Sequence, residues 1–310
     1  MKKAGILSMQ RIYNYGSFLQ AYALKKMMEE CGAEVEFVDY HPGECILPSK
    51  ETTGMKRKIQ KGLEILRMKG RLRDKIQFVK YKKNYARKNY PVLGLKETYN
   101  YAPKLDLLVI GSDEVFNCIQ DNSNVGFAPE LFGAGHQANR LISYAASFGN
   151  TTLESLKKYQ VADQVAQWLR AFDALSVRDE NSRKIVQELT GKDPVCHLDP
   201  VLAYDYPAKL PETKAKIPHD PYMTLYGYSG RFNKEEAGEI RKYAKRKGLK
   251  ILCIGGIQRC GDKFIDCSPF EIFEYFKHAE SVVTDTFHGT IFSVVTQKKF
   301  ATFVRKNGYG

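Results

Sequence analysis

The chain has 310 residues, 43% of them hydrophobic, and a formal charge of +13, which is ordinary for a globular protein of about two domains. No run of about 18 apolar residues occurs, so the sequence predicts no membrane-spanning helix. The seven cysteines are odd in number and scattered, and Cys253, Cys260 and Cys267 recur at a spacing that suits no zinc site. We therefore expect a reducing, cytoplasmic location and no bound metal.

Strands and helices alternate along the first two thirds of the sequence. Ser17 is the expected N-cap of the first helix, and Gly32 its C-terminal stop. This alternation is typical of a parallel sheet with helices on both faces. The predicted strands are 5–9, 34–40, 106–110, 140–146, 174–177 and 195–198, and the predicted helices are 17–31, 153–172 and 180–189.

A second strand–helix series follows residues 205–221, whose content of Pro, Lys and Asp predicts a linker. We expect an α/β protein with two doubly wound, Rossmann-like domains that face a cleft. The first is 1–204, with a basic helical insertion near 55–90, and the second is 220–310, which we expect to be truncated. The predicted strands of the second series are 223–228, 250–254, 281–285 and 300–303, and its helices are 235–247, 269–278 and 290–297.

Most of the positive charge lies in residues 56–88, where fourteen Lys and Arg face only Glu64 and Asp74, a net charge of +12. Apolar residues recur there at helical spacing, which predicts one or two amphipathic helices with a basic face. Such a face is most often only solvated. The alternative is attraction to an anionic surface, either a membrane, a lipid-linked phosphosugar or nucleic acid. Nucleic acid is disfavoured because the sequence contains no nucleic-acid-binding motif.

Residues 282–293 predict a short buried strand that runs into an apolar helix, with His288 at the turn. Gly289 would let the backbone turn tightly. The unpaired N–H groups of a helix start favour an anion, and histidine is the side chain that ordinarily titrates near neutral pH. We therefore expect His288 to transfer a proton to a phosphorylated substrate, with Gly289 and Thr290 in the binding loop. The alternative is a simple helix cap.

Other candidate residues follow predicted strands at the carboxyl edge of the first sheet. Arg178, after strand 174–177, would hold a carboxylate or phosphate through two hydrogen bonds. Alternatively, Arg178 pairs with Asp179 or Glu180. Asp113 and Ser112, after strand 106–110, are candidates to bind the hydroxyls of a ligand, and Asp113 also to accept a proton; the alternative role of both is to cap a turn.

The first strand-to-helix loop contains three further candidates, Asn14, Gly16 and Ser17. Gly16 would allow close approach of the backbone to a ligand, and Asn14 would contact that ligand. The loop is similar to a phosphate- or sugar-binding loop, although it has neither the G-x-G-x-x-G pattern nor the Walker pattern of nucleotide-binding loops.

Six ordered segments together resemble the polysaccharide pyruvyl transferase family. They are NYGSFLQAYAL at 14–24, IGSDEVFN at 110–117, SYAASFG at 143–149, SVRDENS at 176–182, LDPVL at 198–202 and the residues around His288-Gly289. The resemblance implies a two-domain fold similar to that of GT-B glycosyltransferases. It also implies transfer of pyruvate from phosphoenolpyruvate to two hydroxyls of one sugar, with release of phosphate. Many members carry Arg just before the His-Gly pair, where this chain has Thr286-Phe287.

The resemblance therefore implies a cytoplasmic transferase that modifies a cell-surface glycan or its lipid-linked precursor in exopolysaccharide or cell-wall synthesis. If the basic helix brings the enzyme to a lipid-linked acceptor, the enzyme would lie at the inner face of the membrane. The first domain would bind the acceptor and the second phosphoenolpyruvate, which serves as co-substrate with no other cofactor. His288 would protonate the methylene carbon of the donor. Two alternatives remain: a GT-B glycosyltransferase that uses a nucleotide sugar, and a non-catalytic module that docks on an anionic surface through residues 56–88.

Overall fold

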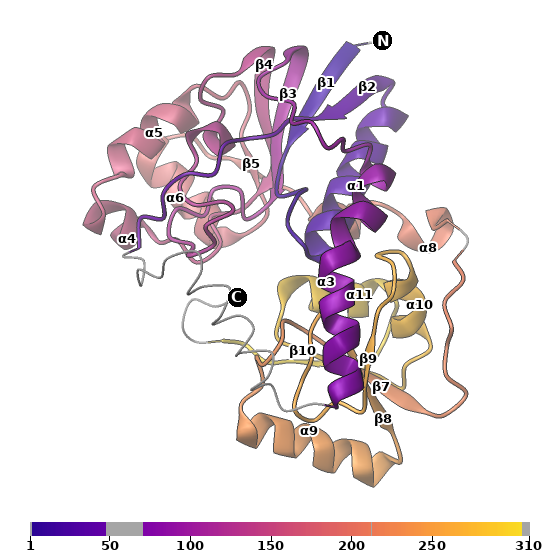
Figure 1. Cartoon of the computed structure of the whole chain (residues 1–310). Helices are drawn as coiled ribbons and strands as arrows, with labels where there is room; N and C mark the ends of the chain where they lie inside the picture. The colour runs from indigo at the N-terminus through magenta and orange to yellow at the C-terminus, as the bar shows by residue number, and fades with distance from the viewer. Residues whose placement is uncertain (1, 48–70, 212, 306–310) are drawn as a thin grey trace. The chain divides into compact units, whose positions relative to one another are not determined.

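The computed structural model describes residues 2–47, 71–211 and 213–305, which form two compact units (Figure 1). The first unit contains the described parts of Met1–Ile12, Ser17–Ser49 and Tyr90–Tyr204. The second contains those of Tyr13–Gly16, Lys50–Asn89 and Asp205–Gly310. The sequence predicts the basic insertion to be part of the amino-terminal domain, whereas the structure groups its described part with the second unit.

The first unit is built on a six-stranded, fully parallel sheet in the order β2-β1-β3-β4-β5-β6. The strand order reverses between β1 and β3, and in folds of this kind ligands bind beyond the carboxyl ends of the strands at such a reversal. The strands are β1 Lys2–Leu7, β2 Ala33–Phe37, β3 Lys104–Asp113, β4 Gln137–Ala146, β5 Ser176–Val177 and β6 Val195–Cys196.

The helices of the first unit surround a core of Leu, Val, Ile and Phe side chains. The predicted helix 153–172 is wrong, because Gln160 has a left-handed backbone (φ 58°) that separates α4 from α5. The helices are α1 Tyr15–Glu30, whose first two residues group with the second unit, the 3₁₀ helix η1 Pro129–Phe132, α4 Leu153–Lys158, α5 Ala162–Arg170, α6 Glu180–Thr190 and α7 Pro200–Ala203.

The second unit contains a five-stranded parallel sheet in the order β11-β10-β7-β8-β9. Its central strand β7 is buried along its whole length, as expected for a parallel strand covered on both faces. The strand order reverses between β7 and β10. The strands are β7 Tyr222–Tyr226, β8 Lys250–Ile254, β9 Lys263–Ile265, β10 Ser281–Thr284 and β11 Phe300–Thr302.

Aromatic side chains fill the core of the second unit. Phe292 lies between Phe273 and Phe276, with ring centroids 5.5 and 5.8 Å away. The predicted linker 205–221 contains a short helix, because the fully buried Tyr206 stacks on Phe273 at 4.8 Å. The helices are α3 Leu72–Leu93, whose last turn groups with the first unit, α8 Tyr206–Lys209, α9 Lys234–Lys247, α10 Glu271–Lys277 and α11 Phe287–Val295.

The predicted fold class is confirmed: two parallel sheets, each connected by helices and each with one reversal of strand order. Within the described part of the chain, no helix combines the length and apolar character that crossing a bilayer requires.

Candidate functional site

Three neighbouring strands of the second unit end at the point where its strand order reverses. β10 leads into Asp285 and Thr286, β7 into Gly227, and β8 into Gly255. At these ends lies a cleft whose open space, solvent included, is about 260 Å³. Its walls are mostly tyrosine: Tyr13, Tyr15, Tyr81, Tyr226 and Tyr228, together with Asn14, Gly227, Gly255 and Thr286.

His288 lies in the first turn of α11, next to this cleft. Thr286 is the N-cap of the helix, and its hydroxyl accepts the backbone N–H of Gly289 at 3.0 Å. Gly289 is therefore helical, and its predicted role as the turn residue is wrong. Its lack of a side chain matters for packing instead, because a Cβ there would overlap the Thr284 hydroxyl and the Tyr226 ring. The Thr290 hydroxyl donates to the Thr286 carbonyl at 3.1 Å.

Gly16, from the opposite end of the sequence, lies directly against the His288 ring. A Cβ at position 16 would overlap Cγ and Nδ1 of that ring, so only glycine fits. Asn14 caps α1, since its Oδ1 accepts the Gly16 N–H at 2.6 Å, while its Nδ2 donates to the Tyr228 hydroxyl. The prediction that Ser17 is the N-cap is therefore wrong. The structure brings Asn14, Gly16 and His288 together within the second unit.

A buried carboxylate with two arginines lies three residues before His288. Asp285, whose side chain is fully buried, accepts hydrogen bonds at Oδ2 from Nε of Arg231 (2.7 Å) and Nε of Arg305 (3.2 Å). Its other oxygen, Oδ1, is buried against Gly227 without a hydrogen-bond partner among the described residues. Burial alone would lower the pKa of Arg305, but its bonds to Glu236 and Asp285 outweigh burial and raise it. Sequence patterns had not identified either arginine.

Three of the cleft tyrosines are buried, neutral hydrogen-bonding groups. Burial raises the pKa of Tyr15, Tyr81 and Tyr226 well above the usual value, so their hydroxyls keep their protons at neutral pH. Tyr15 donates to the Cys267 carbonyl at 2.8 Å, and Tyr85 beside it donates to the Asn14 carbonyl at 2.8 Å. The cleft therefore offers aromatic faces with polar edges next to a histidine.

A second group of predicted residues lies at the carboxyl edge of the first sheet. Arg178 is buried, and its guanidinium donates to Oδ2 of Asp199 (2.7 Å) and Oδ1 of Asp113 (3.4 Å). Burial alone would lower the pKa of Arg178, but these two carboxylates raise it. The alternative pairing with Asp179 or Glu180 is wrong, because Asp179 caps α6 instead.

Two hydroxyls complete this first-unit network. Ser17 donates to Oδ2 of Asp113 at 2.7 Å, and Ser112 donates to the Ala145 carbonyl at 3.0 Å. Asp113 has a left-handed backbone, φ 75°, a conformation that costs a non-glycine residue about 1–3 kcal/mol and is concentrated at functional sites. The network thus holds both oxygens of Asp113 at the end of β3.

The predicted residues therefore fall into two groups, one in each unit. Asn14, Gly16, His288, Gly289 and Thr290 belong to the second unit. Ser17, Ser112, Asp113 and Arg178 belong to the first. Among the residues that the structure describes, no three His, Cys, Asp or Glu side chains are grouped so that they could hold a metal ion.

Comparison with known proteins agrees with the fold and gives the family. No curated protein matches the sequence. A candidate UDP-N-acetylglucosamine 2-epimerase from Listeria monocytogenes has a similar structure, with TM-score 0.51 and 10% identity over 99% of this chain and 80% of that one. MnaA of S. aureus, solved with UDP, has TM-score 0.52 and 12% identity over 97% of this chain and 79% of that one. At these identities the likeness shows the fold alone, and it confirms the predicted GT-B-like architecture. The model of the polysaccharide pyruvyl transferase family matches residues 14–307, nearly the whole chain, and the protein therefore belongs to that family.

Proposed function

We propose that this chain transfers a pyruvyl group from phosphoenolpyruvate to two hydroxyls of one sugar, on a cell-surface glycan or its lipid-linked precursor. Membership of the family supports the reaction. The observation that carries the site is the position of His288, in the first turn of α11 and against Gly16, next to the tyrosine cleft.

In the proposed reaction, His288 donates a proton to the methylene carbon of phosphoenolpyruvate. Positive charge then develops at the carbon that carries the carboxylate and the phosphate, and the first sugar hydroxyl adds there and loses its proton. The carbon–oxygen bond to phosphate breaks next, with its electron pair leaving on phosphate. The second hydroxyl adds at the same carbon and loses its proton. One donor and one sugar diol thus yield one ketal and one phosphate.

The second unit has the groups that an anionic donor needs. The start of α11 presents backbone N–H groups and the positive end of the helix dipole. Arg231 and Arg305 lie close by and are positioned by Asp285, and the carboxylates of Asp285 and Glu236 balance their two charges. The helix start supports the assignment of phosphoenolpyruvate to the second unit.

In the first unit, we propose that Asp113 accepts the proton of an acceptor hydroxyl and that Ser112 and Ser17 lie in the acceptor site. Arg178 would then act by positioning Asp113, because its guanidinium donates to the carboxylates of Asp199 and Asp113. Phosphoenolpyruvate would be the only co-substrate, with no further cofactor. A lipid-linked acceptor would bring the enzyme to the inner face of the membrane in the cytoplasm.

The test compares His288→Gln with His278→Gln, since His278 is exposed at the end of α10. Phosphate release from phosphoenolpyruvate is measured with a panel of methyl glycosides that carry vicinal or 1,3-diols, and donor binding is measured by calorimetry. Loss of a general acid typically lowers the rate by about 10²–10⁴-fold. We expect that loss in His288→Gln, with donor binding retained, and full activity in His278→Gln.

Equal activity in both variants would remove His288 from its proposed role. Calorimetric binding of UDP without binding of phosphoenolpyruvate would favour a glycosyltransferase that uses a nucleotide sugar, an activity that the fold alone permits. Binding of neither ligand would favour the non-catalytic alternative.

A further inference from the structure

Helix α3 has one face packed into the second unit and one face that no described residue covers. Phe78 and Tyr81 are buried on the inner face, where both rings contact Phe264 at 5.4 and 5.7 Å. Asp74, on the same face, accepts the backbone N–H of Phe264 at 3.2 Å. These contacts fix the rotation of the helix, and so they also determine which residues point outward.

The outward face carries large apolar side chains. Leu72 is 70% exposed, Ile76 50% and Val79 44%. Their spacing of four and three residues places them along one side of the helix. Exposure of three neighbouring apolar side chains to water is unfavourable. Their burial in an apolar environment would therefore lower the free energy.

Lysine and arginine alternate with these apolar residues. Arg73, Lys80 and Lys83 are exposed on the same side of α3, and within the described part of the chain no carboxylate lies within ion-pair distance of them. We call this surface the basic–apolar face, and its residues are Leu72, Arg73, Ile76, Val79, Lys80 and Lys83. A helix face that combines exposed apolar residues with unneutralised cations is typical of helices that lie in a membrane interface.

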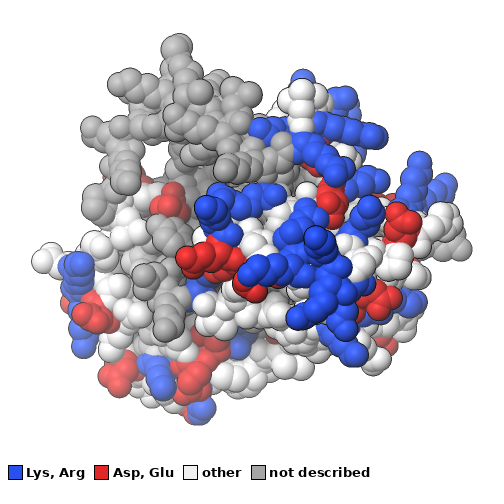
Figure 2. Space-filling model, turned by 90° about the horizontal axis from the view of Figure 1, so that it is seen from below, with Lys and Arg blue, Asp and Glu red and all other residues white. Residues whose placement is uncertain are grey.

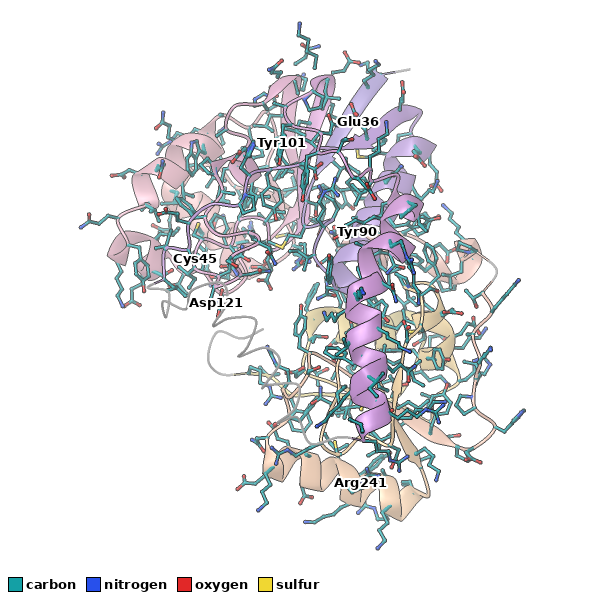
Figure 3. All side chains as sticks on the ribbon, in the orientation of Figure 1. Glu36, Cys45, Tyr90, Tyr101, Asp121 and Arg241 are labelled. Atoms are coloured by element: carbon teal, nitrogen blue, oxygen red, sulfur yellow. The ribbon has the colours of Figure 1, made fainter. Side chains whose placement is uncertain are left out.

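Two further exposed lysines, Lys263 and Lys245, belong to the second unit. Lys263 follows Asp262, which pairs with Arg241 of α9 at 2.9 Å. Lys263 precedes Phe264, whose backbone N–H donates to Asp74 of α3. Lys245 is one turn beyond Arg241 on α9 and is exposed. Figure 2 shows many Lys and Arg side chains, with Asp and Glu among them, on the side of the molecule seen from below, and Figure 3 labels Arg241 on α9.

We propose that the basic–apolar face binds the surface of an anionic lipid membrane, with Leu72, Ile76 and Val79 inserted among the lipids and the cations on the headgroup phosphates. Nucleic acid offers the same phosphates but no apolar interior, so it would leave the three apolar side chains in water. The inference goes beyond the proposed reaction and does not depend on it, because vesicle binding is measured without donor or acceptor.

The test is co-sedimentation of the full chain with vesicles of phosphatidylglycerol and phosphatidylcholine, against vesicles of phosphatidylcholine alone. We expect binding to the anionic vesicles that weakens as salt rises. Each Lys or Arg near such a surface contributes about 1 kcal/mol, so Lys80→Gln/Lys83→Gln should bind about 30-fold more weakly. Ile76→Ser should bind roughly tenfold more weakly, because part of a buried isoleucine's contribution is lost.

The matched control is Lys157→Gln/Lys158→Gln, which removes the same two charges from exposed positions on α4 of the first unit. It should bind like the unmodified chain. Absence of binding to anionic vesicles in about 50 mM salt would overturn the proposal, as would an equal loss in the control. Vesicle binding that Ile76→Ser leaves unchanged, together with tight binding of single-stranded DNA, would instead assign the face to nucleic acid.

Discussion

The buried Arg178 network predicts a large difference between two arginine substitutions in the first unit. Arg178→Met removes a side chain that is 5% exposed and leaves Asp199, 1% exposed, without its charge partner. Arg183→Met removes a partner of Asp193, but those two side chains are 39% and 58% exposed. Burial therefore distinguishes two substitutions that are chemically identical.

The magnitudes follow from the cost of a buried, uncompensated charge. Breaking a buried ion pair on one side costs about 3–5 kcal/mol, whereas an exposed pair contributes roughly 0–1 kcal/mol. With a urea dependence of about 2 kcal/mol per M, Arg178→Met should lower the unfolding midpoint by about 1.5–2.5 M. Arg183→Met should lower it by less than about 0.5 M. The double variant Arg178→Met/Asp199→Asn should recover part of the loss, since the neutral amide needs no counter-charge.

Tryptophan fluorescence is a suitable assay, because Trp168, the single tryptophan of the sequence, lies in α5 of the first unit. Its emission reports the unfolding of the unit that contains Arg178. Equal midpoints for Arg178→Met and Arg183→Met would refute the argument from burial. A double variant as unstable as the sum of its single variants would show that Arg178 and Asp199 are not coupled. Loss of activity in an Arg178 variant is therefore informative about substrate contact only if the variant is folded.

Further predictions concern glycine and cysteine positions. Gly16→Ala should lower phosphate release by about 100-fold, because its Cβ would displace the His288 ring. Gly238 lies inside α9, and a Cβ there would meet open space. Gly238→Ala should therefore raise the free energy of unfolding by about 1 kcal/mol. Activity assays and thermal unfolding check the pair, and an active Gly16→Ala would contradict the first expectation. In the native chain at about pH 8, the exposed Cys31 should react with a disulfide reagent well before Cys267, because burial raises the pKa of Cys267 to about 12 and keeps it a thiol. Mass spectrometry of the labelled chain would contradict this if both thiols reacted at the same rate.

Much of the fold was predictable from local pattern. The apolar run 106–110 lies inside β3, and residues 250–254 form β8 with the predicted bounds. Helix 235–247 differs from α9 by one residue, because a capping box at Asn233 and Gly248 after its end mark it in the sequence. These signals depend on residues that are only a few positions apart, so they can be recognised in a single sequence.

Errors arose where a distant contact overrides the local signal. Ser17 has the chemistry of an N-cap, but its hydroxyl is bound to Asp113, far along the chain, and Asn14 takes the cap. Tyr206 forms a helix in a predicted linker because Phe273 covers it. Neither partner can be identified from spacing, since packing depends on side chains that only the folded chain brings together.

The ordered motifs of the sequence were enough to predict two parallel α/β sheets and the family, because strand runs, strand-end loops and motif order can all be read along the chain. Tertiary structure alone decided the partners of these residues. It placed Gly16 against His288, Arg178 between two carboxylates, and the apolar side chains of α3 outward. The physical reason is that charge pairing, close packing and burial depend on distance in space, and the sequence records only distance along the chain.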